Sequence, residues 1–253
     1  MAREQPKRRF RWRLYLGVAA AMLACASAAA AGMKVRAFAL TGPQFALSPE
    51  DRQAITISGL RYASRTRVLH AFSGDWEKSV FAIPLDERRR RLLAVDWVQD
   101  ASVSRVWPNR IAVRIAERLP VAFVNLSRPL LVDAEGVLLE PPAQARFSFP
   151  VLSGITEAQG EPERRARVRA MLRLLEDLGN ASKDISEVNA AELDNLKVVA
   201  QFENIAIELV LGDRNFARRY ETFVAHYPEI RKRTPEARRF DLRLDDRIVG
   251  AGG

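Results

Sequence analysis

The chain has 253 residues, of which 48% are hydrophobic and 28% are charged, with 13 glycines and 13 prolines. This composition supports a sizeable hydrophobic core and excludes collagen-like, low-complexity and wholly disordered proteins. The single cysteine, Cys25, excludes an intramolecular disulfide and a multi-cysteine metal site. The length predicts about one to two domains.

The net charge of +9 is concentrated at the N-terminus. Residues 1–13 hold six basic side chains and one acidic side chain, so +5 lies in this tail and +4 is spread over the other 240 residues. This distribution favours an anionic membrane surface beside the tail over a nucleic-acid groove along the body.

An uncharged stretch of 20 residues, 14–33, follows the tail. A helix of this length reaches roughly 30 Å, which is the thickness of the hydrocarbon core of a bilayer. More basic residues precede the stretch than follow it, so the positive-inside rule predicts a cytoplasmic N-terminus and an exported body.

The same stretch leaves two alternatives open, because nine of its 20 residues are alanine. A basic start, an apolar core over 14–23 and small residues at 24–26 also fit a cleavable signal peptide. In a third interpretation, Cys25 is the acylated residue of a degenerate lipoprotein signal.

The first domain begins near Gln53, after a predicted linker over 34–52 that has mixed composition and no sustained period. Alternation of Ile111, Val113 and Ile115 with other residues is typical of a half-buried strand. In chain order the patterns predict a strand over 54–57, a helix over 66–72, a helix from Pro84, and strands over 98–106 and 110–116 joined by a turn at 107–109.

Four consecutive arginines, 88–91, fall on the second of these helices. Successive residues of a helix point in different directions, so at least one arginine lies beside the apolar side. We expect it to bury its methylenes and extend its guanidinium into solvent. The alternative is a basic patch that meets lipid headgroups or another protein.

The second part of the chain predicts an α+β domain on a mostly antiparallel sheet. Gly136 marks a hairpin turn, and the arginines of a helix over 161–178 are expected to form a solvated face. The remaining predicted elements are strands over 185–188, 196–202 and 205–211, a helix over 215–229 that exits between Pro228 and Pro235, and closing strands over 240–244 and 247–249.

The sequence contains no recognised catalytic motif. His70 and His226 have no metal-ligating neighbours in sequence, and Asp241, Asp245 and Asp246 alternate with arginines as on a charge-paired edge strand. The sequence therefore predicts no enzyme, metal, cofactor, nucleic-acid or small-molecule site, with an exported envelope enzyme as the alternative. An outer-membrane barrel is excluded because only about 130 residues, interrupted by two helical patterns, follow Ala122.

The order of short motifs resembles one family. The motifs are Ile55-x-Ile57-x-Gly59, Trp97-Val98-x-x-Ala101-x-Val103-x-Arg105-x-Trp107-Pro108-Asn109 and Val113-x-Ile115-x-Glu117-Arg118-x-Pro120-x-Ala122, followed by 131–137, 149–154, 211–212 and 241–243. This series is similar to the POTRA domain and the following domain of the bacterial division family FtsQ/DivIB, and it covers nearly the whole chain.

The resemblance implies a fold and an anchored topology. The fold class is α+β, with an N-terminal transmembrane helix, a β-α-α-β-β POTRA-like domain and a second α+β domain with a mostly antiparallel sheet. The implied organisation is a cytoplasmic tail 1–13, a retained transmembrane helix 14–33, a linker 34–52, a POTRA-like domain 53–120, an FtsQ-type β domain 121–249 and a tail 250–253.

The resemblance also implies a role. The chain would be a non-catalytic, single-pass scaffold of the divisome, in the cell inner membrane at the division septum, with its body in the periplasm. Its implied partners are FtsB and FtsL, with further contacts to FtsK, FtsW, FtsI and FtsN.

Two groups of residues are candidates for function. Arg105, Trp107, Pro108 and Glu117 are expected to act in recruitment through the fold, because the turn fixes strand register. The closing strand is expected at a sheet edge, where a partner strand adds to unpaired backbone groups. The predicted partner-binding residues are Phe240, Leu242, Leu244, Arg247, Ile248 and Val249.

Overall fold

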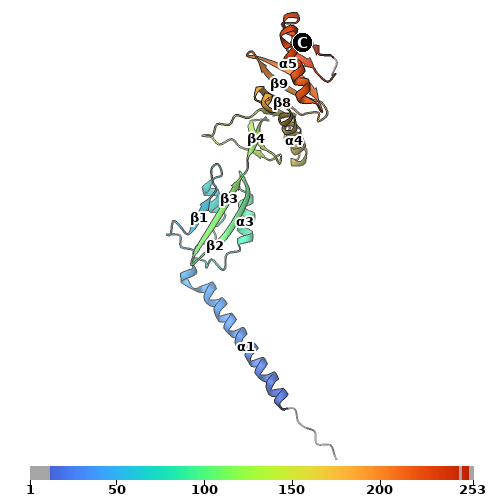
Figure 1. Ribbon diagram of the computed structural model, residues 1–253. Coiled ribbons are helices and arrows are strands. Elements are labelled where there is room, and N and C mark those ends of the chain that lie inside the picture. Colours follow the sequence, from blue (N-terminus) through green and yellow to red (C-terminus); the bar gives the residue numbers. More distant parts are fainter. Residues whose placement is uncertain (1–11, 245–246, 251–253) are drawn as a thin grey trace, which may run out of the picture. The chain divides into compact units, whose positions relative to one another are not determined.

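The computed structural model describes residues 12–244 and 247–250 and divides the chain into two compact units, with the boundary between Glu117 and Arg118 (Figure 1). Of the predicted tail 1–13, residues 1–11 lie outside the described residues. Asp245, Asp246 and residues 251–253 also lie outside them. The architecture confirms the α+β class.

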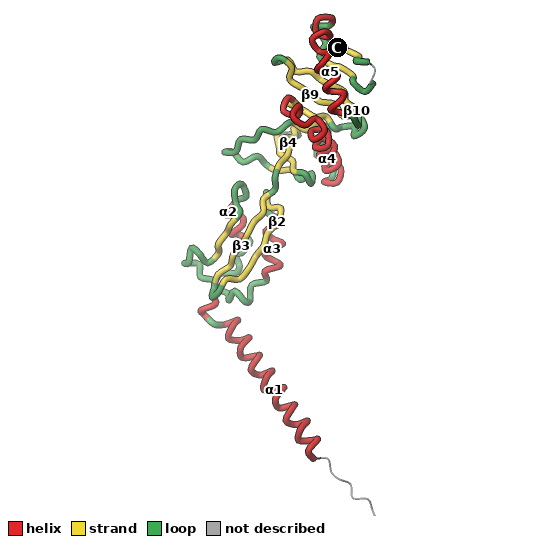
Figure 2. The backbone as a smooth tube through the Cα atoms, in the orientation of Figure 1, coloured by secondary structure: helices red, strands yellow, loops and turns green. Residues whose placement is uncertain are grey.

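The first helix, α1 (Trp12–Thr41), is 30 residues long and extends beyond the predicted apolar stretch (Figure 2). Its segment Tyr15–Thr41 is, within the described residues, the one helix long and apolar enough to cross a membrane, and none of that window is buried by protein. Lys34 and Arg36 do not end the helix, because the alanine-rich residues after them favour helix and Gly42-Pro43 is the first breaker.

The structure does not contain the linker expected over 34–52. The chain is ordered on both sides of Gly42-Pro43. Residues up to Thr41 are helical, and a short 3₁₀ turn, η1 (Pro43–Phe45), leads into a segment that packs on the first unit. Phe45 is 6% exposed and Leu47 is fully buried. The Leu47 amide donates to the Lys78 carbonyl at 2.9 Å, so this segment joins the domain through backbone hydrogen bonds.

The first unit has the predicted β-α-α-β-β order. Its elements are β1 (Ile55–Ser58), α2 (Arg65–His70), α3 (Leu85–Leu93), β2 (Val98–Val106) and β3 (Arg110–Glu117). In the described residues the three strands form a sheet of order β1-β3-β2, parallel between β1 and β3 and antiparallel between β2 and β3. Ile111, Val113 and Ile115 of the central strand are buried, as their alternation predicts.

Gly59 ends β1 in a conformation that requires glycine. Its φ is +84°, and a Cβ at this position would lie 2.0 Å from the carbonyl oxygen of Ile115. The glycine of the opening motif therefore permits the close approach of β1 to the central strand.

The arginine run on α3 departs from its prediction at Arg88. This side chain does not reach solvent; its Nε and Nη2 bind the two carboxylate oxygens of Asp75 at 2.5 and 2.6 Å. The side chains are 7% and 1% exposed. The expectation of an outward guanidinium is wrong because a buried carboxylate, which the helical pattern does not reveal, compensates the charge inside the unit.

The second unit forms, in the described residues, a nine-stranded sheet of order β12-β11-β10-β9-β8-β7-β4-β5-β6. Its elements are β4 (Pro120–Asn125), β5 (Pro129–Asp133), β6 (Leu138–Leu139), β7 (Val151–Ser153), α4 (Glu161–Leu178), η2 (Gly179–Asp184), β8 (Ile185–Asn189), β9 (Leu196–Phe202), β10 (Ile205–Gly212), α5 (Phe216–Arg233), β11 (Arg239–Asp241) and β12 (Val249–Gly250).

The pairing in this sheet is mostly antiparallel, with parallel pairs at β4/β7, β7/β8 and β10/β11. The sequence patterns do not predict β4 and β7 as strands. β7 has three residues and offers too short a run for a periodic signal, yet it lies between β4 and β8. Its position is set by neighbours that are remote in sequence.

Helix α4 begins and ends as predicted, and its apolar side enters the core. The expected solvated face is wrong for Arg164 and Arg165, whose Nε atoms donate to the carbonyls of Gly136 and Glu135 at 2.8 and 3.0 Å. Gly136 has a φ of +82°, and a Cβ there would lie 2.6 Å from the Arg165 amide. The predicted hairpin turn is therefore packed tightly against α4.

Helix α5 continues to Arg233, so the predicted end at Glu229 is four residues too early, although the exit does fall between Pro228 and Pro235. Pro228 lies inside the helix with its ring exposed. Tyr227 before it and Ile230 after it pack on the core, which holds the helix in place on both sides of the missing hydrogen bond. Both long helices of the second unit thus share one core with the strands (Figure 1).

Candidate partner-binding site

The last strand of the described residues, β12, lies at one edge of the nine-stranded sheet. It pairs antiparallel with β11, with Val249 opposite Asp241 and Gly250 opposite Phe240. This geometry confirms the expected edge position of the closing strand. The two strands are shorter than predicted, with β11 spanning Arg239–Asp241 and β12 spanning Val249–Gly250.

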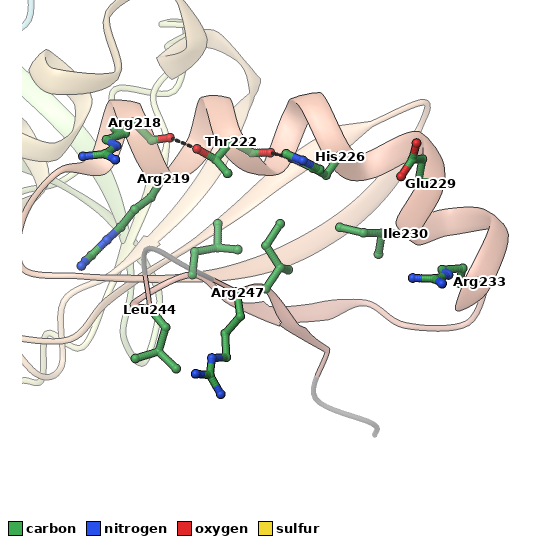
Figure 3. A pocket seen from close by; sticks show the side chains of 11 residues that line it. Arg218, Arg219, Thr222, His226, Glu229, Ile230, Arg233, Leu244 and Arg247 are labelled. Atoms are coloured by element: carbon green, nitrogen blue, oxygen red, sulfur yellow. Dashed lines mark hydrogen bonds between the residues drawn. The ribbon is translucent and has the colours of Figure 1, made fainter.

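A groove of about 410 Å³ lies beside this edge, between α5 and the segment around β11 and β12. Figure 3 shows α5 along one side and Leu244 and Arg247 on the segment that forms the other side. The lining residues are Arg218, Arg219, Thr222, His226, Glu229, Ile230, Arg233, Leu242, Leu244, Arg247 and Ile248.

Arg219 fixes the two sides of the groove to each other. Its guanidinium is almost buried, and it donates to the Leu211 carbonyl at 2.6 Å and to the Arg243 carbonyl at 2.8 Å. It thereby joins α5 to the end of β10 and to the chain after β11. Arg219 is not among the residues predicted from the sequence, although its place on the apolar side of α5, between Phe216 and Tyr220, is a usable signal.

The predicted partner-binding residues divide by burial. Phe240 is 2% exposed, and its ring packs 5.1 Å from that of Phe223, so its side chain belongs to the core. Leu242 is 3% exposed and forms the floor of the groove. Leu244 and Val249 are 53% and 45% exposed. Of the remaining two, Ile248 is half-buried and Arg247 is exposed.

The rim of the groove is basic. Arg218, Arg233 and Arg247 are exposed, and Glu229 is the acidic residue that lines the same groove. A concave surface with this excess of positive charge attracts acidic segments. Nearby, Arg243 binds the carboxylate of Asp241 at 2.6 Å, and this hydrogen bond, more than the opposing desolvation, lowers the pKa of Asp241 below its ordinary value.

The polar side chains of α5 in the groove make local bonds. The Thr222 hydroxyl donates to the Arg218 carbonyl at 2.8 Å, and Nδ1 of His226 lies 2.8 Å from the Thr222 carbonyl oxygen (Figure 3). Throughout the described residues, no group of three or more His, Cys, Asp or Glu side chains is placed to hold a metal ion.

The other predicted group lies in the first unit. Arg105 donates to the carbonyls of Val80 and Ile83 at 2.6 and 2.8 Å. The carboxylate of Glu117 accepts hydrogen bonds from the backbone amides of residues 61–63 at 2.7 to 3.0 Å. Both side chains hold loops against the sheet.

The turn residues of this group are placed differently. Trp107 is 70% exposed, and its ring makes edge contacts with Phe45 at 5.5 Å and Phe81 at 5.8 Å. Pro108 follows it in the turn between β2 and β3. Trp107 thus combines contacts inside the first unit with a large free surface.

Comparison with known families decides the relationship. The family model described as "POTRA domain, FtsQ-type" matches residues 52–118, and the one described as "Cell division protein FtsQ/DivIB, C-terminal" matches residues 122–243. The chain belongs to the FtsQ/DivIB family of cell-division proteins. Most residues that line the groove lie in the second matched region, but the match stops at Arg243, so the placement of Leu244, Arg247 and Ile248 in the site rests on geometry alone.

Individual relatives agree with the two family models. The cell division protein FtsQ of Koribacter versatilis is 36% identical over 207 residues, which cover 79% of this chain and 60% of that protein. The FtsQ of Streptomyces bingchenggensis is 30% identical over 200 residues, covering 75% of this chain and 72% of that protein. The FtsQ of Geotalea daltonii is 24% identical over 203 residues, which cover 78% of this chain and 74% of that protein.

Family membership and the apolar α1 together support a single-pass inner-membrane protein with a role in cell division. The same membership supports action through protein–protein interaction within the division machinery.

Proposed function

We propose that this FtsQ/DivIB protein is a non-catalytic divisome scaffold that receives a strand of a partner at β12. The observation that carries the proposal is an edge strand beside a groove with an apolar floor and a basic rim. The resemblance points to FtsB, together with FtsL, as the partner. FtsK, FtsW, FtsI and FtsN are further partners in the same assembly.

Strand addition explains why both features are needed. An extended peptide gains affinity from backbone hydrogen bonds to an edge and gains specificity from alternate side chains that enter a pocket. Here β12 would supply the backbone, and Leu242 and Ile248 would supply apolar surface. The arginines on the rim would select a segment that carries acidic residues.

The proposed topology places the N-terminus in the cytoplasm and both folded units in the periplasm, at the division septum. The six basic residues of 1–13 support this orientation. Sequencing the N-terminus of the protein from membranes tests it. A mature protein that begins near Ser27 or Ala29 would instead show cleavage by signal peptidase, and loss of membrane attachment in Cys25→Ser alone would indicate a lipoprotein.

The binding proposal is tested by recovery of FtsB with the membrane-anchored chain after crosslinking in dividing cells. Ile248→Pro removes a backbone donor and restricts φ next to the edge strand, so FtsB recovery should be lost. Deletion of 247–253 should have the same effect. Normal recovery with both changes would mean that the interface lies elsewhere, and the exposed arginines of α4 would be the next candidates.

A matched pair of substitutions separates groove contact from general damage. Leu244→Asp places a carboxylate at a residue that lines the groove, whereas Val224→Asp places one on α5 outside it; the native side chains are 53% and 42% exposed. We expect recovery of FtsB to fall at least tenfold in Leu244→Asp and to stay near normal in Val224→Asp. Equal losses in both variants would contradict a site in the groove.

A further inference from the structure

An exposed aromatic surface lies where α1 meets the first folded unit. Its members are Phe38 and Leu40 in the last turn of α1, and Val106 and Trp107 at the tip of the β2–β3 hairpin, with exposed fractions of 61%, 37%, 42% and 70%. Phe45 and Phe81 connect them. The ring of Phe45 makes edge contacts with Phe38 at 5.7 Å, with Phe81 at 5.3 Å and with Trp107 at 5.5 Å.

The junction beneath this aromatic surface is held by hydrogen bonds. The Ser79 hydroxyl donates to the Ala39 carbonyl at 2.6 Å, near the end of α1, and the Val80 amide donates to the Phe45 carbonyl at 2.9 Å. Arg105 in turn binds the Val80 carbonyl. The end of α1, the segment after it and the hairpin tip are therefore joined by a continuous set of bonds, which keeps Trp107 close to the last turn of the helix.

The length of α1 places this junction near a bilayer surface. If the uncharged residues up to Met33 occupy the hydrocarbon core, Phe38 lies five residues further along the helix, or about 7.5 Å at a rise of 1.5 Å per residue. The headgroup layer on each side is roughly 5–8 Å thick. Lys34 and Arg36 fall within the same layer, where their side chains meet lipid phosphates.

We infer that Phe38 and Trp107 form an interfacial anchor that seats the hairpin tip of the POTRA domain in the headgroup layer of the membrane. The inference rests on α1 spanning the bilayer. Tryptophan is enriched at this depth because its indole combines a large apolar surface with a polar N–H. The anchor explains why the large side chain of Trp107 is 70% exposed at the end of the β2–β3 hairpin, although its ring also contacts Phe45 and Phe81. The ligand is the phospholipid interface.

Fluorescence quenching by brominated phospholipids tests the anchor in the full chain, reconstituted in phosphatidylcholine vesicles. Bromine on the acyl chains, close to the headgroups, quenches only those indoles that it reaches. The difference between the wild type and Trp107→Phe isolates the emission of Trp107. The Trp97→Phe difference is the matched control, because Trp97 is 4% exposed and precedes the opposite end of the same strand, β2.

We expect brominated lipid to reduce the Trp107 emission by at least half and to leave the Trp97 emission unchanged. Unquenched Trp107 emission in protein whose Trp12 emission is quenched would overturn the anchor while leaving the membrane span intact. If neither emission is quenched, both the span and the anchor are wrong. Unquenched Trp107 together with lost septal recruitment in Trp107→Phe would make this residue a protein contact.

A second measurement avoids any change to the aromatic contacts. A spin label at Asn109→Cys, in a Cys25→Ser background, reports depth through its relative accessibility to oxygen and to a water-soluble nickel chelate. Gln99→Cys, which is exposed at the other end of β2, is the control. Preferential oxygen accessibility at 109 and not at 99 is expected, and equal aqueous accessibility at both positions would contradict the anchor.

Discussion

Arginines of the two units of this protein illustrate two different uses of this side chain. In the first unit, buried Arg88 binds the Asp75 carboxylate, and Arg105, which is exposed, donates to the carbonyls of the loop before α3. In the second unit, Arg218 and Arg233 lie exposed along the groove beside β12. The contrast indicates that Arg88 and Arg105 maintain the fold of the first unit, whereas Arg218 and Arg233 are exposed for recognition.

Arg219 shows that the role of an arginine follows from its hydrogen-bond partners and not from its position in the sequence. It is adjacent to exposed Arg218 on α5, yet its guanidinium is buried and donates hydrogen bonds to two backbone carbonyls. The second unit therefore contains both uses of arginine on one turn of one helix.

Removal of one partner of the buried pair should cause the largest loss of stability. In Asp75→Asn the guanidinium of Arg88 stays buried and keeps only the partly exposed Glu87 as a countercharge, so the free energy of unfolding should fall by about 3–5 kcal/mol. Denaturant unfolding of the full chain in detergent measures it. Asp100→Asn is the control, because Asp100 pairs with Arg89 of the same helix at an exposed site. Similar losses in both variants would contradict the role of burial.

The pair of neighbours on α5 should respond in different measurements. Arg219→Met leaves two carbonyls without their donor, so stability should fall by about 1–3 kcal/mol and amide exchange over 239–244 should rise. Arg218→Met should leave stability and exchange unchanged and weaken partner recovery. If Arg218→Met destabilises as much as Arg219→Met, the two arginines do not have separate roles.

Trp107 should have a smaller effect on folding. Trp107→Ala removes two edge contacts between rings, which are worth about 0.5–1.5 kcal/mol. The thermal midpoint of the first unit in the full chain should therefore fall, and Trp107→Phe should restore most of it. An unchanged midpoint with lost recruitment to the division site would show that Trp107 acts by direct contact.

The smallest expected effect is a pH dependence at the site itself. Arg243 lowers the pKa of Asp241, so the ionised pair stabilises the fold fully above the ordinary aspartate value of 3.8. This contribution is lost as the pH falls through the lower pKa of the folded state. Unfolding midpoints of wild type and Asp241→Asn should thus differ slightly at neutral pH and converge in acid. A difference that grows in acid would have the wrong sign for this mechanism.

Local sequence patterns determined most of the elements. The helix over 161–178, the strands at 98–106 and 196–202, and the turn glycine at 136 could be read from apolar period and from residues with special backbone freedom. Each of these signals depends on neighbours within a few residues. The membrane-spanning character of the first helix is equally local, because it requires only a long uncharged run.

The details that give the site its form were decided by the tertiary structure. The sequence placed Phe240 among the contact residues, but packing against Phe223 buries it, and no local signal for β7 exists in three residues. Two contacts of buried arginines were likewise beyond local patterns, since the Asp75 carboxylate lies 13 residues from Arg88 and the Arg243 carbonyl lies 24 residues from Arg219. A guanidinium is buried only where the fold supplies acceptors to compensate its lost hydration, and the sequence alone does not indicate which distant acceptors will meet it.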